Sequence, residues 1–204
     1  MPRLGMVIDL KKCAGCYACV AACKAEHATP KGVLWCRVVK QEIGTYPRVR
    51  RIPLPLQCMH CADPPCEKIC PTGATQKRAD GAVIVDYGLC MGCRACMIAC
   101  PYQARYFLAE IRPYYNGQGL TRYEEHGLRT KGYVVGTVSK CDFCADRRAE
   151  GKEPACTANC PGKARYFGDL ADPESEVSRL IRDRRGFQLH AEFGTDPSVY
   201  YLPL

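Results

Sequence analysis

The sequence predicts an α+β fold in which short strands and short helices flank loops that carry most of the cysteines. Two observations support this class: sixteen of the 17 cysteines fall into four groups of four, and short sequence patterns recur at fixed offsets. The chain has 204 residues, enough for one domain or two small ones. No apolar run approaches the roughly 20 residues that would span a bilayer.

The spacing of the cysteines predicts the chemistry. Two groups have the spacing C-x2-C-x2-C-x3-C, a third lengthens the middle gap to four residues, and the fourth lengthens it to eleven. In bacterial ferredoxins, three such cysteines bind one 4Fe–4S cluster and the last binds a neighbouring cluster. Sixteen ligands at four per cluster predict four clusters and an electron-transfer role. The groups, in the order described, are Cys13, Cys16, Cys19 and Cys23; Cys90, Cys93, Cys96 and Cys100; Cys58, Cys61, Cys66 and Cys70; and Cys141, Cys144, Cys156 and Cys160.

The residues around these groups agree with this interpretation. Pro71, Pro101 and Pro161 directly follow three of the four closing cysteines, as in the ferredoxin pattern, whereas Lys24 follows the first group. Cys36 belongs to no group, and we expect it to be a small packed thiol.

Disulfides and zinc are the competing explanations for so many cysteines. Disulfide frameworks belong to small secreted domains, and residues 1–8 lack the pattern of a signal peptide. Zinc sites favour two separated C-x2-C pairs, an arrangement that only the group from Cys141 to Cys160 imitates. Four cubanes are therefore favoured, and three cubanes with a different fourth centre remain an alternative. A zinc-rich nucleic-acid-binding module is the competing function from another class.

The formal charge of +8 does not require a nucleic-acid partner. Sixteen thiolates and four doubly positive cluster cores carry roughly the opposite charge, so the basic residues compensate for anionic clusters. Lys12, Arg94 and Lys140 lie beside ligands or within the loops, and we expect them to tune the clusters. His60 lies between two ligands and is expected to be a spacer or a hydrogen-bond donor to sulfur. No nucleophile with its base and no nucleotide-binding loop is present, so we expect no catalysis by this chain.

Internal repeats divide the chain into half-modules, each with a strand, a cysteine loop, a short helix and a returning strand. Val7-Ile8-Asp9 matches Ile84-Val85-Asp86 at an offset of 77 residues, and Ala104-Arg-Tyr-Phe107 recurs as Ala164-Arg-Tyr-Phe167. The predicted strands span residues 6–10, 82–86, 104–108 and 164–167.

Two insertions and a C-terminal segment complete the prediction. Residues 35–56 are expected to form a hairpin that crosses between domains. Residues 111–138 are expected to form either a docking surface or a packed cover over the clusters. Asp172 is predicted to cap a helix with Pro173 at its first position and with a buried stripe. Residues 195–204 are predicted to form an extended arm on this chain or on a neighbour. The tyrosines of the insertion are Tyr114, Tyr115, Tyr123 and Tyr133, and the stripe is Val177, Leu180 and Ile181.

The chain resembles one family over nearly its full length. The resemblance rests on the four groups, on the variant Cys58-Met-His-Cys61-Ala-Asp-Pro-Pro-Cys66, on the eleven-residue gap, and on the segment Gly168-Asp-Leu-Ala-Asp-Pro-Glu-Ser-Glu-Val177. The family comprises the four-cluster iron–sulfur subunits of molybdopterin oxidoreductases, including dimethyl sulfoxide, polysulfide, thiosulfate, tetrathionate and arsenate reductases. Some relatives replace one cysteine and hold a three-iron cluster, whereas this chain replaces none.

The resemblance implies two ferredoxin-like domains that each hold two 4Fe–4S clusters. Residues 1–45 with 135–170 would form one domain, residues 46–134 the other, and residues 171–204 a C-terminal helix and arm. The resemblance also implies that paired groups exchange their closing cysteines. The implied ligand sets are Cys13, Cys16, Cys19 and Cys160; Cys23, Cys141, Cys144 and Cys156; Cys58, Cys61, Cys66 and Cys100; and Cys70, Cys90, Cys93 and Cys96.

The implied function is a non-catalytic electron relay between a molybdopterin or tungstopterin catalytic subunit and an integral membrane subunit that reacts with quinone. The alternative is the same relay in a soluble tungsten or molybdenum oxidoreductase or hydrogenase, which would use ferredoxin or a flavin subunit. The implied location is peripheral and held at the membrane by partners. The periplasmic side, reached by co-export with a twin-arginine partner, is favoured over the cytoplasm.

Overall fold

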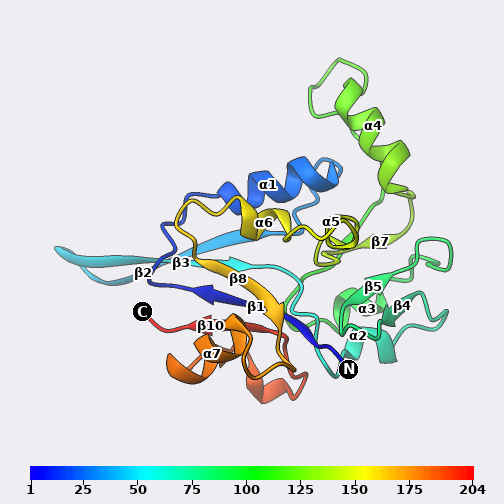
Figure 1. The fold of residues 1–204 in the computed structure, drawn as a ribbon. Coiled ribbons are helices and arrows are strands. Elements are labelled where there is room, and N and C mark those ends of the chain that lie inside the picture. Colours follow the sequence, from blue (N-terminus) through cyan, green and yellow to red (C-terminus); the bar gives the residue numbers. More distant parts are fainter.

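A four-stranded mixed sheet lies at the centre of the fold (Figure 1). In the computed structural model, which describes residues 1–204, the strand order is β8-β1-β10-β9. β1 (Leu4–Asp9) pairs antiparallel with β8 (Arg165–Asp169) and parallel with β10 (Val199–Leu202), and β10 pairs with β9 (Phe187–Gln188). The predicted strands at residues 6–10 and 164–167 are confirmed. The C-terminal arm lies on this chain as a strand of its main sheet.

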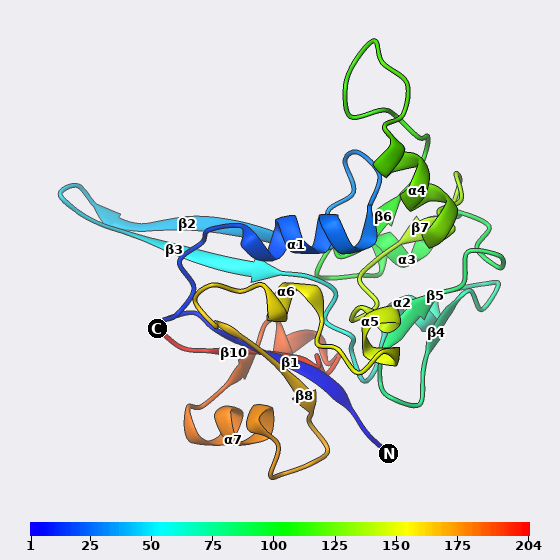
Figure 2. The ribbon, with the colours of Figure 1, turned by 45° about the horizontal axis from the view of Figure 1, so that its top comes forward.

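Both faces of β1 are covered, which explains its uninterrupted apolar run. Met6, Val7 and Ile8 are all buried. α7 (Glu176–Asp183) covers one face, where Val177 packs with Val7. The opposite face carries the cysteine loops with α1 (Ala18–His27) and α6 (Ala155–Ala158) (Figures 1 and 2).

The predicted start of α7 is wrong by three residues. Ser175, not Asp172, caps the helix, and its side chain accepts a hydrogen bond from the Ser178 amide at 3.2 Å. The Asp172 carboxylate instead accepts from the amide of Glu174 at 2.9 Å, which holds a turn before the helix. The predicted stripe is confirmed, since Val177 is buried and its partners Leu180 and Ile181 pack beside it in a satellite core.

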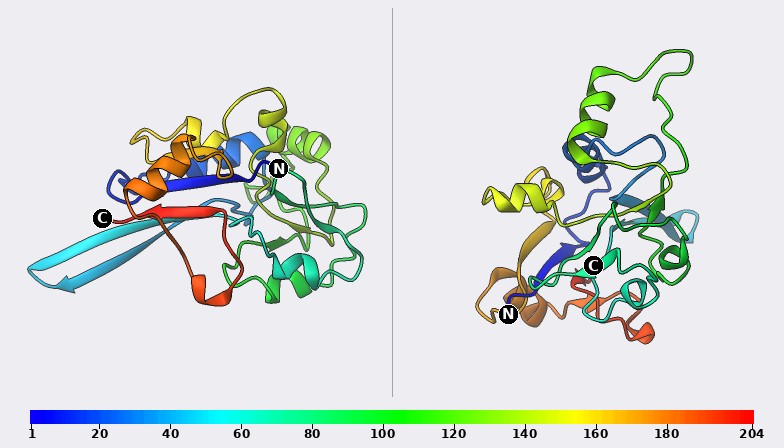
Figure 3. Two further views of the ribbon diagram at one scale, coloured as in Figure 1. Left: turned by 60° about the horizontal axis from the view of Figure 1, so that its bottom comes forward. Right: turned by 90° about the vertical axis from the view of Figure 1, so that its right-hand side faces the viewer.

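A hairpin is confirmed at the predicted residues and projects far from the body (Figure 3, left), whereas its crossing between two domains stays a prediction. β2 (Arg37–Thr45) and β3 (Arg48–Leu56) pair antiparallel over their full length. The base of the hairpin joins the core, because the Tyr201 hydroxyl donates to the Pro55 carbonyl at 2.7 Å. Its outer part exposes Ile43, Tyr46 and Val49.

The other half of the molecule consists of short elements between cysteine loops. β4 (Thr75–Lys77) pairs with β5 (Val83–Val85), and β6 (Tyr106–Phe107) pairs with β7 (Val138–Ser139). These pairs confirm the strands predicted within residues 82–86 and 104–108, in shortened form. The remaining short helices are α2 (Pro65–Lys68), α3 (Ala95–Ile98), α5 (Ala145–Ala149) and the single turn η1 (Ala191–Phe193).

The insertion at residues 111–138 contains a helix that we did not predict. α4 (Arg122–Lys131) stands away from the sheet (Figure 1) and begins with a capping box formed by Thr121 and Glu124. Gly132 ends it in the left-handed conformation, φ 63°. Tyr133 is buried whereas Tyr115 is exposed, so the insertion combines a packed base with a free outer surface. No helix of the protein is long and apolar enough to cross a membrane.

Candidate iron–sulfur sites

Four cavities of similar size are each lined by the four cysteines of one implied ligand set, and we name them sites A to D; Cys36 also lies in the wall of site B. The space in each, part of it open to solvent, is about 400 Å³ for A, 320 Å³ for B, 330 Å³ for C and 310 Å³ for D. Site A has Cys13, Cys16, Cys19 and Cys160; site B has Cys23, Cys141, Cys144 and Cys156; site C has Cys58, Cys61, Cys66 and Cys100; and site D has Cys70, Cys90, Cys93 and Cys96. These are the four ligand sets named above, and that each set binds one cluster stays a prediction.

Short helices explain why each group contributes to two sites. α1 carries Cys19 into site A and Cys23 into site B. Four residues of helix advance by about 6 Å, which takes the later cysteine to the neighbouring cavity. The same step from α6 separates Cys156 of site B from Cys160 of site A. α2 and α3 make the corresponding exchange between sites C and D.

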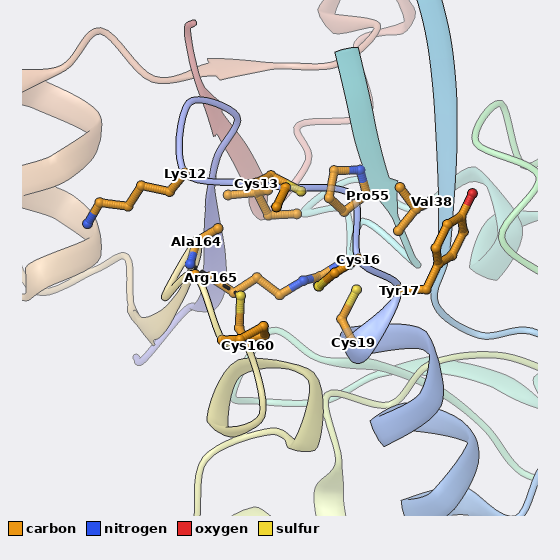
Figure 4. A pocket seen from close by; sticks show the side chains of 15 residues that line it. Lys12, Cys13, Cys16, Tyr17, Cys19, Val38, Pro55, Cys160, Ala164 and Arg165 are labelled. Carbon is orange, nitrogen blue, oxygen red and sulfur yellow. Dashed lines mark hydrogen bonds between the residues drawn. The ribbon is translucent and has the colours of Figure 1, made fainter. Parts of the chain in front are cut away.

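The loops of sites A and D bend in the same way. Gly15 and Tyr17 in site A, and Gly92 and Arg94 in site D, all have a left-handed backbone with φ between 63 and 71°. A side chain at Gly92 would place its Cβ 1.9 Å from a carbonyl oxygen of Gly136, so the close approach requires glycine. In site A the side chains of Cys13, Cys16, Cys19 and Cys160 surround a common space, and Arg165 reaches into it (Figure 4).

The donors around these cavities fit an anionic sulfur-rich group. Backbone amides point at ligand sulfurs: Ala164 at Cys160 Sγ, 3.3 Å away, and Ala155 at Cys144 Sγ, 3.4 Å away. His27 Nε2 also lies 3.1 Å from Cys144 Sγ. Hydrogen bonds to sulfur are a recurrent feature of iron–sulfur sites.

Three buried polar atoms have no hydrogen-bond partner within the chain: His60 Nε2, Arg105 Nη2 and Thr157 Oγ1. Each belongs to a residue beside a ligand or in a cavity wall, since His60 precedes Cys61, Thr157 follows Cys156, and Arg105 lines site C. Buried polar groups are nearly always paired in folded proteins. Their position therefore fits cavities that hold a further hydrogen-bonding group.

Several buried thiols have raised pKa values, which indicates that a bound group must supply positive charge before they can become thiolates. Burial raises the pKa of Cys61 and of Cys144 to about 12, and it raises the pKa of Cys141 well above its usual range. Thiolates bind metal, so iron must displace these protons and supply the compensating positive charge. No group of three or more His, Cys, Asp or Glu side chains is placed to hold a single metal ion. A cubane, which presents its irons at separated corners, suits these wider cavities better than tetrahedral zinc.

The sites follow one another in the order A, B, C, D. Arg165 lines site A, and its Nη1 lies 3.7 Å from Cys156 Sγ of site B. Phe143 lines site B and stacks on His60, which lies in the loop of site C. Arg105 connects sites C and D: it lines site C, and its Nη1 donates at 3.0 Å to Thr75 Oγ1 in the wall of site D.

The two ends of this row differ from its middle. Cys16 of site A and Cys93 of site D are exposed. Every cysteine of sites B and C is buried or half-buried. The row is therefore accessible from the surface at both ends and shielded between them.

The residues expected to tune the sites have unequal environments. Lys12 is exposed and donates to the Tyr166 hydroxyl at 2.5 Å, and Arg94 lies over the Phe107 ring, 3.8 Å from its centroid. Lys140 is buried, but its ammonium donates to backbone carbonyls of Val83 and Cys141. Cys36 is buried as predicted.

Sequence reasoning missed the two arginines that lie between sites. Arg105 and Arg165 occupy the second position of the repeated Ala-Arg-Tyr-Phe motif, which we interpreted only as a strand. The signal was present, because both copies follow a closing cysteine at the same distance.

Comparison with known proteins agrees with this geometry. The family model of the 4Fe–4S dicluster domain matches residues 49–131 and 123–170. A selenate reductase subunit from Mesobacillus selenatarsenatis is 45% identical over 206 residues, which covers 97% of this chain and 70% of that protein. A sulfite dehydrogenase subunit from Allochromatium vinosum is 39% identical over 225 residues, covering 100% of this chain and 84% of that protein.

A third relative is the iron–sulfur cluster-binding subunit of menaquinone reductase from Nitratidesulfovibrio vulgaris. It is 37% identical over 229 residues, which covers 98% of this chain and 88% of that protein. The domain model spans more than half of the chain, and the relatives match nearly all of it. The chain therefore belongs to the 4Fe–4S dicluster family of iron–sulfur subunits of oxidoreductase complexes.

Proposed function

We propose that this chain holds four 4Fe–4S clusters, one in each of sites A to D, and relays electrons along the row. The observation that carries this proposal is the series of four cavities, each lined by one complete set of four candidate ligands, with exposed cysteines at the two ends of the row. When bound, each cluster takes up and releases an electron at a potential set by hydrogen bonds, burial and nearby charge. The chain contributes the thiolates, the amides that donate to sulfur, and the packing that excludes water between sites.

The proposed architecture is two ferredoxin-like domains with the boundaries given above. Sites A and B would belong to residues 1–45 with 135–170, and sites C and D to residues 46–134, with Cys100 and Cys70 exchanged within that domain. The boundary at residue 45 coincides with the turn between β2 and β3, so each domain would contribute one strand to the hairpin.

The proposed partners are a molybdopterin or tungstopterin catalytic subunit at one end and a quinone-reactive membrane subunit at the other. Exposed apolar side chains at both outer sites support docking there: Tyr17 lines site A, Met91 lines site D, and Ile98 is exposed at the end of α3, two residues after the site D ligand Cys96. Exposed apolar patches on soluble proteins commonly mark interaction sites. The relatives named as subunits of a selenate reductase and a menaquinone reductase are consistent with partners of these two kinds. The proposed location is peripheral, on the periplasmic side by co-export with a partner.

Iron and sulfide analysis tests the cluster number. The anaerobically prepared, reconstituted full chain should contain about 16 iron and about 16 acid-labile sulfide. A reproducible value near 12, on the same reasoning, would reject four cubanes.

Purification from the native source tests the partners. We expect a complex that contains a pterin subunit and a membrane subunit. A complex with ferredoxin or a flavin subunit instead would support the soluble alternative. The isolated chain should accept electrons from dithionite but should not reduce selenate, arsenate or dimethyl sulfoxide, because it has no substrate site of its own.

A further inference from the structure

Two buried arginines occupy equivalent positions in the two halves of the molecule. Arg105 and Arg165 each stand five residues after a closing cysteine, and each is 4% exposed. A guanidinium keeps its positive charge in proteins, and a buried charge is unfavourable unless opposite charge surrounds it. Neither arginine forms an ion pair with a carboxylate. The compensating charge must therefore come from the sulfur ligands.

Arg165 reaches from site A into site B. Its side chain lines site A, and its Nη1 lies 3.7 Å from Cys156 Sγ and 3.2 Å from Gln57 Oε1, both in the wall of site B. Its Nη2 donates to Cys36 Sγ at 3.3 Å. Burial acts to lower the pKa of Arg165, but the Cys36, Cys156 and Cys19 thiols outweigh it and raise the pKa well above its usual value.

Arg105 is placed in the same way between sites C and D. Its side chain lines site C, Nη1 donates to Thr75 Oγ1 in the wall of site D, and Nη2 has no hydrogen-bond partner within the chain. Burial acts to lower its pKa, whereas Cys66 of site C and Cys96 of site D raise it, with a net increase. Each guanidinium group therefore lies between two neighbouring sites and contacts residues in the walls of both.

We propose that each arginine raises the reduction potentials of the two clusters on either side of it, Arg165 those of sites A and B and Arg105 those of sites C and D. This inference rests on the proposed function, because it requires a cluster in each site. Reduction adds negative charge to a cluster, and a fixed positive charge in a buried, weakly screened position stabilises the reduced form. A charge between two clusters also attracts both of them when reduced, which offsets part of the repulsion between two reduced neighbours.

A redox titration followed by electron paramagnetic resonance on the full, iron-loaded chain tests this inference. In Arg105→Gln, the ratio of reduced to oxidised cluster at a fixed potential should fall at least tenfold in two transitions, a shift of about 59 mV to lower potential for each one-electron step. Arg165→Gln should shift the other two transitions. Arg182→Gln is the control, because Arg182 is exposed on α7, lines none of the four sites, and carries a charge that water screens.

Arg105→Gln and Arg165→Gln should shift different pairs of transitions. The test therefore does not require that each resonance signal be assigned to a site beforehand. Unchanged potentials at full iron content, or shifts of the same transitions by both Arg→Gln variants, would overturn the inference. If Arg105→Gln loses iron, Arg105→Lys decides, because a lysine keeps a positive charge at this position. Retained iron with less than a tenfold change in both transitions supports the inference, whereas a tenfold or larger fall in both transitions, or equal iron loss in both variants, contradicts it. An iron content well below 16 in the unsubstituted chain would instead refute the proposed function.

Discussion

The imidazole of His60 stacks on the ring of Phe143, with ring centroids 3.6 Å apart and an interplanar angle of 17°. Both side chains are almost completely buried, and they fill the space between sites B and C. The Val83 amide donates to His60 Nδ1 at 3.0 Å, which places the imidazole proton on Nε2. This stack is a direct side-chain contact between the wall of site B and the loop of site C.

Removing the Phe143 ring should therefore destabilise the protein strongly. We expect Phe143→Ala to reduce the free energy of unfolding by about 3–5 kcal/mol, because it leaves a cavity in a closely packed junction. The measurement is the thermal midpoint of iron-loaded protein at a fixed scan rate. Phe193→Ala is the control, since Phe193 is 56% exposed, and it should change stability by less than about 0.5 kcal/mol. Similar midpoints for the two variants would show that the stack is not a stabilising junction.

Serine substitutions separate ligands from packed thiols. Cys36→Ser should leave the iron content unchanged, because Cys36 lies in no ligand set and a serine oxygen can accept the hydrogen bond from Arg165. Cys93→Ser should perturb one cluster and weaken folding through lost ligation energy. Iron analysis and the reduction spectrum report both effects. Loss of iron in Cys36→Ser would mean that our ligand sets are incomplete.

Iron removal should unfold the chain. The largest core cluster includes Cys19, Cys23, Cys58, Cys61 and Cys156, so the interior is built around the sites rather than around apolar side chains alone. Binding energy at sites that the unfolded chain lacks is folding energy. We expect chelation under reducing conditions to abolish near-ultraviolet circular dichroism and to open the sheet to proteolysis. A chain that stays protease-resistant without iron would show that packing alone suffices.

The strands were predictable because their signal is local. Met6-Val7-Ile8 is a β-branched apolar run, and its counterpart before the third loop repeats it. The start of α7 was not predictable from the local sequence, because Asp172 and Ser175 are both favourable N-cap residues. Ser175 is the cap because Asp172 forms a turn before the helix. α4 escaped prediction because its surface is almost entirely polar, although the Thr121 and Glu124 capping box was present in the sequence.

Some features of the sites could likewise be predicted from local sequence, whereas others depend on contacts between distant segments. The cysteine spacing identifies candidate ligands, because three of them follow one another within a loop. The position of Arg165 depends on how distant segments pack, as in its 3.3 Å contact with Cys36, which is 129 residues away in the sequence, whereas Arg105 reaches Thr75 only 30 residues away. The repeated motif marks both arginines, but it does not show between which sites they lie.

The two interpretations of residues 111–138, a docking surface and a packed cover, predict different results for two tyrosine variants. Tyr133 is buried, and its hydroxyl donates to the His27 carbonyl at 2.9 Å, so Tyr133→Ala should lower stability by about 3–5 kcal/mol. Tyr115→Ala, at a position 61% exposed, should leave the thermal midpoint within about 2 °C. If the outer part of the insertion docks a partner, Tyr115→Ala should also weaken assembly of the native complex. Unaltered assembly would assign the insertion to a cover alone.

The exposed apolar side chains at the site D end provide the sharpest test of docking. Ile98 ends α3 two residues after the site D ligand Cys96 and two residues before the site C ligand Cys100, and it is 89% exposed, so a charge there should not disturb folding. Ile98→Glu should retain about 16 iron, yet it should weaken co-purification with a partner subunit because a carboxylate would be desolvated in the interface. Phe193→Glu is the matched control, since Phe193 is exposed in η1, where no candidate ligand is near in the sequence. Equal assembly of the two variants would exclude this end of the row as a docking surface, and electrons would then have to leave the chain elsewhere.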